Sequence, residues 1–354
     1  MKTINKFLAT GFTGLLLAGS AQAITLGLPT PNPMSTGAAH NDFYVYPLEL
    51  IKDCAAAGDA RCSYTGSLPV DSSTGLWNPL LQIYEAGGGN DNYSLSGPLT
   101  GSLATVGVDN PFRPPSGDTT DFFMTSSNEP GEAPHTGNAS AEFAADLMGR
   151  WDAELSSVVN YLTDANGKLH DLVFLFDNNE QGSAANALAV WGQVYITDAN
   201  GNNVMGADNK PICFEISNRS PFSGCSSTGP EPADFVLAAS FCVNKITGNA
   251  DFSYLTQNSC PSATHYWLSN NLGSNAAEFA AFAPGLNAGL RNWANLGYSM
   301  SVDLIMLNIG SGAEALAICD QCDIAGTNIP EPASMALVGL SLLGLGAMRR
   351  RKQV

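Results

Sequence analysis

Short apolar segments separated by turn residues dominate the middle of the chain. They are rich in β-branched and aromatic residues, and clusters of Gly, Pro, Asn, Asp and Ser bound them, which is typical of β-strands. Residues 169–176 (LHDLVFLF) and 189–197 (AVWGQVYIT) are the clearest cases. We predict further strands over residues 156–163, 212–216, 235–243, 299–309 and 315–318, the last two as a hairpin around residues 310–312.

The pentapeptide Thr-Asp-Ala-Asn-Gly occurs twice, over residues 163–167 and 197–201. Each copy follows a predicted strand and ends in Asn-Gly, the strongest short-range signal for a hairpin turn. Asn and Gly tolerate the positive φ angles that such turns require. We therefore expect a tight turn at both places.

Helical patterns are confined to a few short segments. We predict helices over residues 48–57, 139–147 and 275–296, the last divided near Pro284. Residues 107–140 are rich in Pro, Gly and polar residues, which predicts a long loop or insertion. Strands and helices do not alternate, so the pattern favours an all-β fold, an antiparallel β-sandwich of jelly-roll type with a few short peripheral helices.

The charge of the chain excludes one class of binding partner. Its 354 residues include 15 Lys and Arg against 32 Asp and Glu, a net charge of −17. An apolar fraction of 44% is enough for a core. Nucleic acid is excluded as a partner, because its binding depends on Lys and Arg at the phosphates.

The first 23 residues have the three parts of a secretory signal peptide. Lys2 and Lys6 precede an apolar run over residues 7–18, and the run leads to a small-x-small pattern that ends at Ala23. The apolar run is too short to cross a bilayer. We predict cleavage by signal peptidase after Ala23 and an exported body over residues 24–329.

The C-terminal tail also has three ordered parts. Pro330, Glu331 and Pro332 precede an apolar run over residues 333–348, which predicts a hydrophobic helix. The run is followed by a cationic cluster, expected to stay cytoplasmic, that consists of Arg349, Arg350, Arg351 and Lys352. A second Pro-Glu-Pro at residues 230–232 lacks the apolar run and the cluster, so we predict a plain loop there.

This tail resembles the PEP-CTERM sorting signal of Gram-negative bacteria, and the resemblance is confined to about residues 329–354. It implies that an exosortase, an integral-membrane transpeptidase-like enzyme, recognises the tail and cleaves near Pro330 to Pro332. It also implies a cell-surface or extracellular protein with a transient inner-membrane anchor, in bacteria that make exopolysaccharide. Residues 24–330 carry 9 Lys and Arg against 31 Asp and Glu, so the body is more acidic than the whole chain.

All eight cysteines lie in the body, and an even number in an exported chain favours disulfides. A redox or zinc role for the Cys319-x-x-Cys322 motif is the alternative. The spacing suggests local pairs, namely Cys54–Cys62, Cys213–Cys225, Cys242–Cys260 and Cys319–Cys322.

Candidate metal ligands are few. Asp198, Asn200 and Asn202 place oxygen side chains at alternate positions, as in the first part of an EF-hand loop. Asn203 and Asn209 stand where that loop requires Gly and Glu. The pattern favours a turn, with weak calcium binding as the alternative, and we predict no other cofactor.

Catalytic patterns are missing from the sequence. It contains four His, no Gly-x-Ser-x-Gly elbow, no Walker loop and no dinucleotide fingerprint. Tyr266 and Trp267 form an aromatic pair that would stack on a sugar ring if exposed, although large aromatics in a sandwich are more often core residues. The missing patterns predict a non-catalytic protein, and the resemblance of the tail implies a surface or matrix protein linked to exopolysaccharide and biofilm. A carbohydrate-binding module and a secreted hydrolase are the alternatives.

Overall fold

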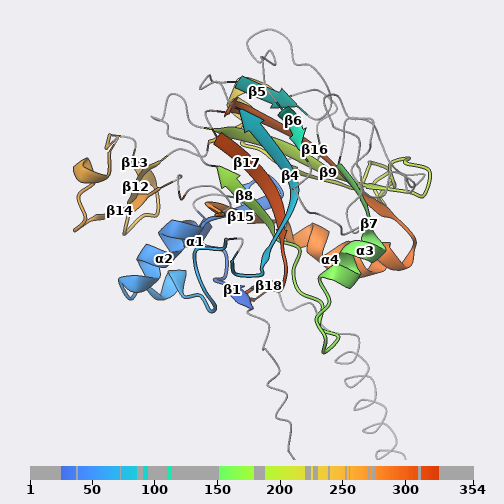
Figure 1. The fold of residues 1–354 in the computed structure, drawn as a ribbon, viewed down its shortest axis with the longest axis horizontal. Helices are drawn as coiled ribbons and strands as arrows, with labels where there is room; N and C mark the ends of the chain where they lie inside the picture. The colour runs from blue at the N-terminus through green and yellow to red at the C-terminus, as the bar shows by residue number, and fades with distance from the viewer. Residues whose placement is uncertain are drawn as a thin grey trace, which may run out of the picture.

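Two large β-sheets contain most of the strands in the computed structural model (Figure 1). The structure describes residues 25–36, 39–71, 73–85, 91–94, 110–113, 151–178, 188–219, 225, 230–237, 240–251, 253–254, 256–269, 272, 276–309 and 312–326. The described residues form mostly β structure in largely antiparallel sheets, and this confirms the β-rich, antiparallel part of the predicted fold class.

The larger sheet has seven strands in the order β2-β3-β15-β8-β17-β4-β6, and every neighbouring pair is antiparallel. Its two central strands, β8 and β17, carry apolar residues that are buried, such as Phe174 and Ile318. The strand bounds are β2 (Ala39–His40), β3 (Phe43–Pro47), β15 (Phe279–Phe282), β8 (Phe174–Asn178), β17 (Gly312–Cys319), β4 (Trp77–Glu85) and β6 (Asn110–Arg113).

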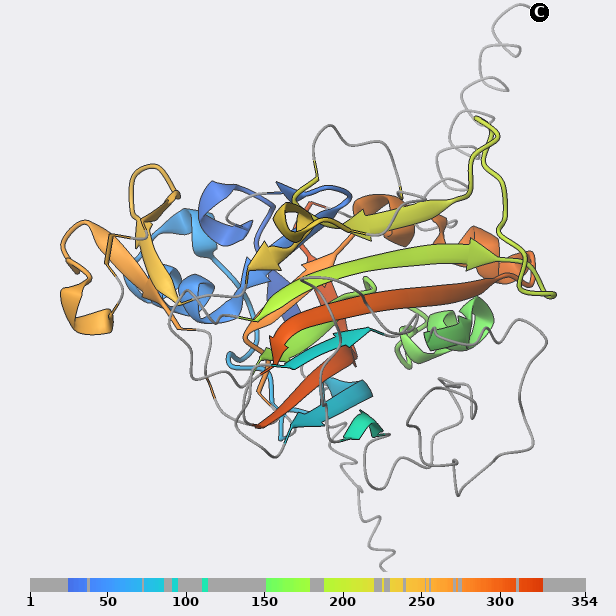
Figure 2. The same cartoon turned by 90° about the horizontal axis from the view of Figure 1, so that it is seen from above.

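The second large sheet has six strands built around β9 and β16, which run side by side in Figure 2. β10 and β11 both pair with β9, whereas β5 and β7 pair with β16. The strand bounds are β10 (Cys213–Ile216), β9 (Ala189–Thr197), β16 (Ser299–Ile309), β5 (Asp91–Ser94), β11 (Val236–Leu237) and β7 (Trp151–Glu154).

Both large sheets contribute to one buried apolar cluster. Phe174 and Ile318 belong to it from the larger sheet, and Val194 and Val302 from the second sheet. Burial of apolar surface of this kind is the main favourable contribution to folding. The core therefore joins strands that are far apart in the sequence.

Two small sheets complete the fold. β12 (Phe241–Asn244) lies between β13 (Ala250–Asp251) and β14 (His265–Leu268) in a three-stranded sheet. This sheet projects from the end of the molecule opposite α3 and α4 in both ribbon views (Figures 1 and 2). The fourth sheet pairs β1 (Leu26–Leu28) with β18 (Cys322–Ile324), and this pair is parallel.

The described helices are short. α2 contacts β14 and β3, and α3 contacts α4. Among the described residues, none of the helices has the length and apolar character needed to cross a bilayer. The helices are α1 (Pro33–Thr36), α2 (Leu48–Ala56), α3 (Leu155–Tyr161) and α4 (Pro284–Asn295), with 3₁₀ turns at Ala60–Cys62, Pro232–Asp234 and Gln257–Ser259.

Several predicted elements are confirmed. Strand β9 has the predicted bounds of residues 189–197, and α2 matches the helix predicted over residues 48–57. Both copies of the repeated pentapeptide form turns, because the glycine N–H donates to the carbonyl of the aspartate three residues earlier in each. Gly167 and Gly201 have φ angles of 82° and 79°, the left-handed region that glycine tolerates.

Two predicted elements are of the wrong type. Residues 156–163 were predicted as a strand, but Leu155–Tyr161 form α3, whose Leu155 and Val158 are buried at helical spacing. The first part of the helix predicted over residues 275–296 is strand β15. Its four residues are all buried between β3 and β8, and such a short, wholly apolar segment has no diagnostic periodicity.

The predicted connections also need correction. Strands β16 and β17 do not form a hairpin, because β16 lies in the six-stranded sheet and β17 in the seven-stranded sheet. Residues 235–243 contribute to two strands in different sheets, β11 and β12. Within the loop predicted over residues 107–140, Asn110–Arg113 form strand β6, and residues 114–140 lie outside the described residues. The helix predicted over residues 139–147 also lies outside them.

Candidate functional site

The six-stranded sheet has a second buried face that carries polar side chains. Along β9, Val194 and Ile196 belong to the main core, whereas Trp191 belongs to a separate small cluster with Phe235 and Ile305. Successive side chains of a strand point to opposite faces. Gln193, Tyr195 and Thr197 therefore lie on the same face as Trp191.

Three neighbouring strands bring a carboxylate, an amide and another carboxylate into one row. Glu215 of β10 is opposite Gln193 of β9, and Gln193 is opposite Asp303 of β16. All three side chains are buried, and Glu215 has no exposed surface. We call Glu215, Gln193 and Asp303 the polar row.

Hydrogen bonds hold the polar row in place. The Gln193 Nε2 atom donates to Glu215 Oε2 over 2.6 Å, and the Ser217 hydroxyl donates to Glu215 Oε1, also over 2.6 Å. The Tyr195 hydroxyl donates to Gln193 Oε1 over 2.5 Å. Both oxygens of Glu215 thus accept hydrogen bonds from neighbouring side chains, which a buried polar group requires.

Asp42 extends this network to the edge of the larger sheet. The Glu215 backbone N–H donates to Asp42 Oδ2 over 2.9 Å, and the Asp42 N–H donates to the Glu215 carbonyl over 3.1 Å. Burial raises the pKa of the Asp42 carboxyl, the N–H of Glu215 opposes this, and the negative charge of Glu215 adds to the rise. Asp42 is therefore a group whose ionisation opposes folding.

Replacing Asp42 with Asn is expected to raise the free energy of unfolding at pH 7, by less than about 1 kcal/mol because the side chain is partly exposed. Because the pKa of Asp42 is higher in the folded protein, the wild type has the full contribution of this carboxyl to the free energy of unfolding below the unfolded pKa of about 4. It loses that contribution as the pH rises through the folded pKa. Urea unfolding of both proteins between pH 4 and pH 8 measures the difference.

Asp198→Asn is the matched control with the opposite sign. The N–H groups of Asn202 and Asn200 lower the pKa of Asp198, so its stabilisation is present above the unfolded pKa and lost as the pH falls. This variant should lose stability at pH 7. If the free energy of unfolding of Asp42→Asn and of the wild type changed in the same way with pH, the raised pKa of Asp42 would be contradicted.

The predicted calcium ligands form the turn that the pattern favoured. Asp198 Oδ1 accepts hydrogen bonds from the backbone N–H groups of Asn200 and Asn202, over 2.8 and 2.9 Å. The Asn202 amide also donates to both carboxylate oxygens of Asp198. Within the described part of the chain, no three His, Cys, Asp or Glu residues are grouped as a metal site.

The predicted aromatic pair does not share one surface. Tyr266 and Trp267 are successive residues of β14, so their rings lie on opposite faces of the small sheet. Tyr266 is buried, and the Lys245 ammonium lies 4.7 Å from its ring centroid. Trp267 is half-buried opposite Cys242. A joint stacking platform is therefore not formed, and only Trp267 has a partly open ring.

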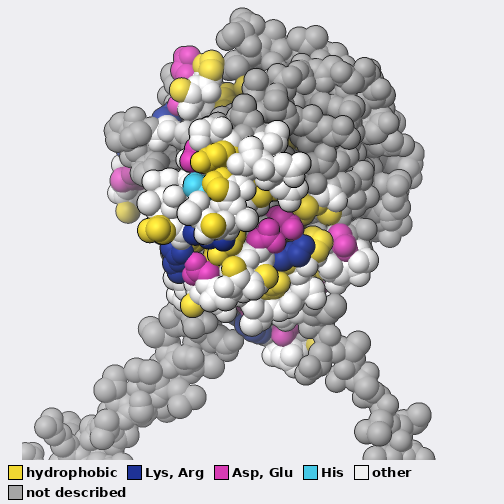
Figure 3. Space-filling model, turned by 90° about the vertical axis from the view of Figure 1, so that its left-hand side faces the viewer, with side chains coloured by type: hydrophobic (Ala, Val, Ile, Leu, Met, Phe, Trp, Pro, Cys, Tyr) yellow, Lys and Arg dark blue, Asp and Glu magenta, His cyan; other side chains and the backbone are white. Residues whose placement is uncertain are grey.

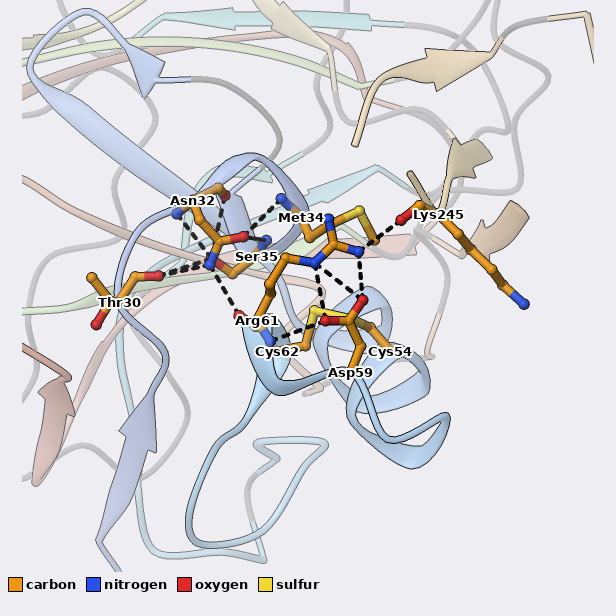
Figure 4. The surroundings of a disulfide bond; sticks show 9 residues. All are labelled: Thr30, Asn32, Met34, Ser35, Cys54, Asp59, Arg61, Cys62 and Lys245. Carbon is orange, nitrogen blue, oxygen red and sulfur yellow. Dashed lines mark hydrogen bonds and ion pairs between the residues drawn. A yellow bond between two sulfur atoms is a disulfide. The ribbon is translucent and has the colours of Figure 1, made fainter. Parts of the chain in front are cut away.

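The structure pairs all eight cysteines in the four local combinations suggested by their spacing, which are Cys54–Cys62, Cys213–Cys225, Cys242–Cys260 and Cys319–Cys322. Figure 4 shows the first of these pairs. There, the Arg61 guanidinium donates to Asp59 and to the Lys245 carbonyl, the latter over 2.7 Å. Hydrogen bonding to Arg61 lowers the pKa of Asp59. This contact connects the 3₁₀ turn Ala60–Cys62 with the small sheet.

Figure 3 shows Lys and Arg side chains close to Asp and Glu side chains on one side of the molecule. Lys52 is paired with Glu49, and Arg61 with Asp59.

The described histidines lie at three separate places. His40 Nδ1 is 2.7 Å from Asn218 Oδ1, His170 Nδ1 is 3.0 Å from Asp323 Oδ1, and His265 Nδ1 is 2.8 Å from Thr264 Oγ1. The structure does not bring them together into one site. His135 lies outside the described residues.

Residues 26–305 match the family described as a domain of unknown function, DUF8239. The chain belongs to the DUF8239 family. Residues 328–352 match the PEP-CTERM protein-sorting motif, which confirms the resemblance of the tail. No curated protein and no solved structure matches the chain.

The sorting motif makes this DUF8239 protein an exported protein that exosortase processes and that its C-terminal tail anchors transiently. The predicted processing residues lie outside the described residues and stay predictions, as does the hydrophobic helix over residues 333–348. These residues are Ala23, Pro330, Glu331, Pro332, Arg349, Arg350 and Arg351.

Sequence reasoning missed the polar row. Its three members are about 20 to 110 positions apart in the chain, and none belongs to a motif. The signal was the mixed pattern of β9 and β16, in which Gln193, Asp303 and Ser301 interrupt otherwise apolar segments. Polar residues at strand spacing within an apolar segment indicate a second face that is not part of the main core.

Proposed function

We propose that this protein is a non-catalytic surface or matrix protein that acts together with exopolysaccharide after exosortase processing. The observation that carries the proposal is the sorting motif over residues 328–352, which follows a disulfide-linked body. Exported substrates of this kind need a body that stays folded outside the cell, and disulfides persist in that environment.

The structural hydrogen bonds of two acidic side chains support a non-catalytic role. Glu215 accepts hydrogen bonds from Gln193 and Ser217, and Asp198 accepts them from its own turn. A general base must be able to reach the proton of a substrate. Carboxylates that already accept several structural hydrogen bonds are poorly placed for that task.

The proposal is tested by replacing Arg349, Arg350 and Arg351 together with Ala in the native host. We expect export to continue and cleavage near Pro330 to stop, because the cationic cluster fixes the cytoplasmic end of the tail. Intact-mass spectrometry of the membrane and secreted fractions measures the cleavage. Pro230→Ala in the second Pro-Glu-Pro is the matched control and should be processed normally. Normal cleavage of the triple variant would overturn the claim that processing requires the cationic cluster.

The link to exopolysaccharide is tested by the same fractionation in a host that cannot make the polymer. The processed body should then move from the matrix fraction to the medium. An unchanged distribution would contradict the link while leaving the processing result intact.

A carbohydrate-binding module is the second candidate, and the half-buried Trp267 is the observation that favours it. Indole rings that are partly open can stack on a sugar face. The secreted hydrolase is weaker, since its best acidic pair, Glu215 and Asp303, is buried on either side of Gln193.

We also propose that the two large sheets are the layers of a sandwich. The single apolar cluster to which both contribute supports this arrangement. We propose that the strands of the two layers are connected as in a jelly roll, which is the architecture predicted from the sequence.

A further inference from the structure

The strand β18 is the last described strand before the sorting motif. Gly326 ends the described chain, and residues 327–329 separate it from Pro330. An extended chain spans at most about 3.5 Å per residue, so the chain between Gly326 and Pro330 can reach no more than roughly 14 Å. Any pull that reaches the body from an anchored tail therefore arrives first at β18.

One edge of β18 pairs with β1 in parallel orientation, and the two strands lie side by side in Figure 1. Leu26 is opposite Cys322, and Leu28 is opposite Ile324. The Leu26 N–H donates to the Gln321 carbonyl over 3.2 Å, and the Ala325 N–H donates to the Leu28 carbonyl over 2.8 Å. A parallel pair leaves the two chain ends at opposite ends of the ladder. A pull on these ends loads all the bonds at once instead of one after another.

The other edge of β18 is held by Asp171. The Asp171 N–H donates to the Cys322 carbonyl over 2.9 Å, and the Ile324 N–H donates to Asp171 Oδ2 over 2.8 Å. Asp171 is buried, which makes these bonds costly to break without replacement. The strand is therefore fixed on both sides along its whole length.

The side chain of Asp323 adds ionic contacts at the middle of β18. Lys168 Nζ lies 2.5 Å from Asp323 Oδ2, and His170 Nδ1 lies 3.0 Å from Asp323 Oδ1. Burial alone would raise the pKa of Asp323, but hydrogen bonds with His170 and Lys168 hold that pKa below its usual value. Asp164 is 3.7 Å from the far nitrogen of His170. The carboxylate of Asp323 thus connects β18 with residues 164–170.

Strand β1 is itself fastened to the body. The N–H groups of Gly27 and Thr65 each donate to the carbonyl of the other over 2.9 Å. A methyl group at Gly27 would come within 2.4 Å of the Thr65 hydroxyl, so there is no room for a larger side chain at this position. Force on β18 is therefore passed through β1 to the segment that follows the Cys54–Cys62 disulfide.

We propose that β18, β1 and the contacts of Asp323 form a mechanical clamp that resists force applied through the C-terminal attachment. The proposal rests on the proposed function as an exosortase substrate, whose C-terminal tail holds the body at the membrane before cleavage. Its role is to keep the body folded while one end of the chain is held at the membrane or surface. The clamp comprises β1, β18, Lys168, His170, Asp171 and Asp323.

Single-molecule pulling of the full chain, held in detergent by its two ends, tests the clamp. Under constant force, Asp323→Asn should open about tenfold faster than the wild type, because a partly buried hydrogen-bonded charge is lost. Asp251→Asn is the matched control, since Asp251 also faces a histidine, with 3.4 Å between Asp251 Oδ2 and His265 Nε2, in a sheet outside the clamp. The control should open at the wild-type rate.

Equal opening rates for Asp323→Asn and the wild type would overturn the clamp, as would equal acceleration in both variants. Urea unfolding without force separates a general loss of stability, which would affect opening at every site, from a loss confined to β18. The pulling measurement does not depend on exosortase. Its failure would therefore leave the cleavage result of the Arg349, Arg350 and Arg351 variant untouched, and failure of cleavage would leave the pulling result untouched.

Discussion

Replacing Phe282 with Ala is expected to lower the free energy of unfolding by about 3–5 kcal/mol. Phe282 ends β15, has no exposed surface, and stacks on Tyr44 and Tyr46 with ring centroids 5.7 Å away in each case. Its removal would leave a cavity beside the Tyr44 and Tyr46 rings on one face of the sheet, where the paired backbones of β15 and β3 limit any collapse. Equilibrium urea unfolding followed by circular dichroism measures the loss.

Ile246→Ala is the control for this prediction. Ile246 is 83% exposed, so its truncation should change the free energy of unfolding by no more than about 0.5 kcal/mol. A similar loss in both variants would show that Phe282 is not a core residue. The comparison therefore tests the packing of the larger sheet directly.

Replacing Cys242 and Cys260 with Ala is expected to unfold the small sheet while the large sheets stay folded. The disulfide closes a loop with a sequence separation of 18, and a bridge of that size contributes about 3 kcal/mol in the loop-entropy description. Strands β12, β13 and β14 have only two to four residues each, too few to be stable without such a crosslink. Hydrogen exchange should rise over residues 241–268 and not in β9 or β17.

The Cys319–Cys322 pair provides the comparison. Its sequence separation is 3, so its removal releases much less chain entropy. A Cys319→Ala and Cys322→Ala variant should therefore keep slow exchange in the small sheet. Unchanged exchange over residues 241–268 after loss of Cys242–Cys260 would contradict the proposed dependence.

Local patterns in the sequence predicted local features well. Strand β9 was predicted because its residues are apolar and β-branched and end at an Asn-Gly turn, and the structure has the same bounds. The four disulfides join cysteines that are close in the sequence, so spacing alone suggested them. In each case the information lies within one short segment.

Features that depend on long-range pairing could not be predicted in this way. Residues 155–161 mix apolar and polar side chains and residues 279–282 are wholly apolar, but both segments are short, and only their neighbours decide between helix and strand. The assignment of β16 and β17 to different sheets depends on their partners β9 and β8. Neighbouring segments in the sequence contain no information on that choice.

The candidate site illustrates the same limit. Glu215, Gln193 and Asp303 become neighbours only through the register of β10, β9 and β16. The predicted site residues Tyr266 and Trp267 are adjacent in the sequence, and for that reason they point to opposite faces of β14. Adjacency in a strand separates side chains, whereas register across strands brings them together.

The pairing of β1 with β18 also sets the order of events during export. Strand β1 is among the first parts of the body to cross the membrane, and its partner follows only after nearly all of the remaining chain has crossed, since Leu26 pairs with Cys322. Contacts between such distant residues form slowly because a long loop must close first. The body therefore completes its fold only when its last strand has emerged, just ahead of the sorting motif.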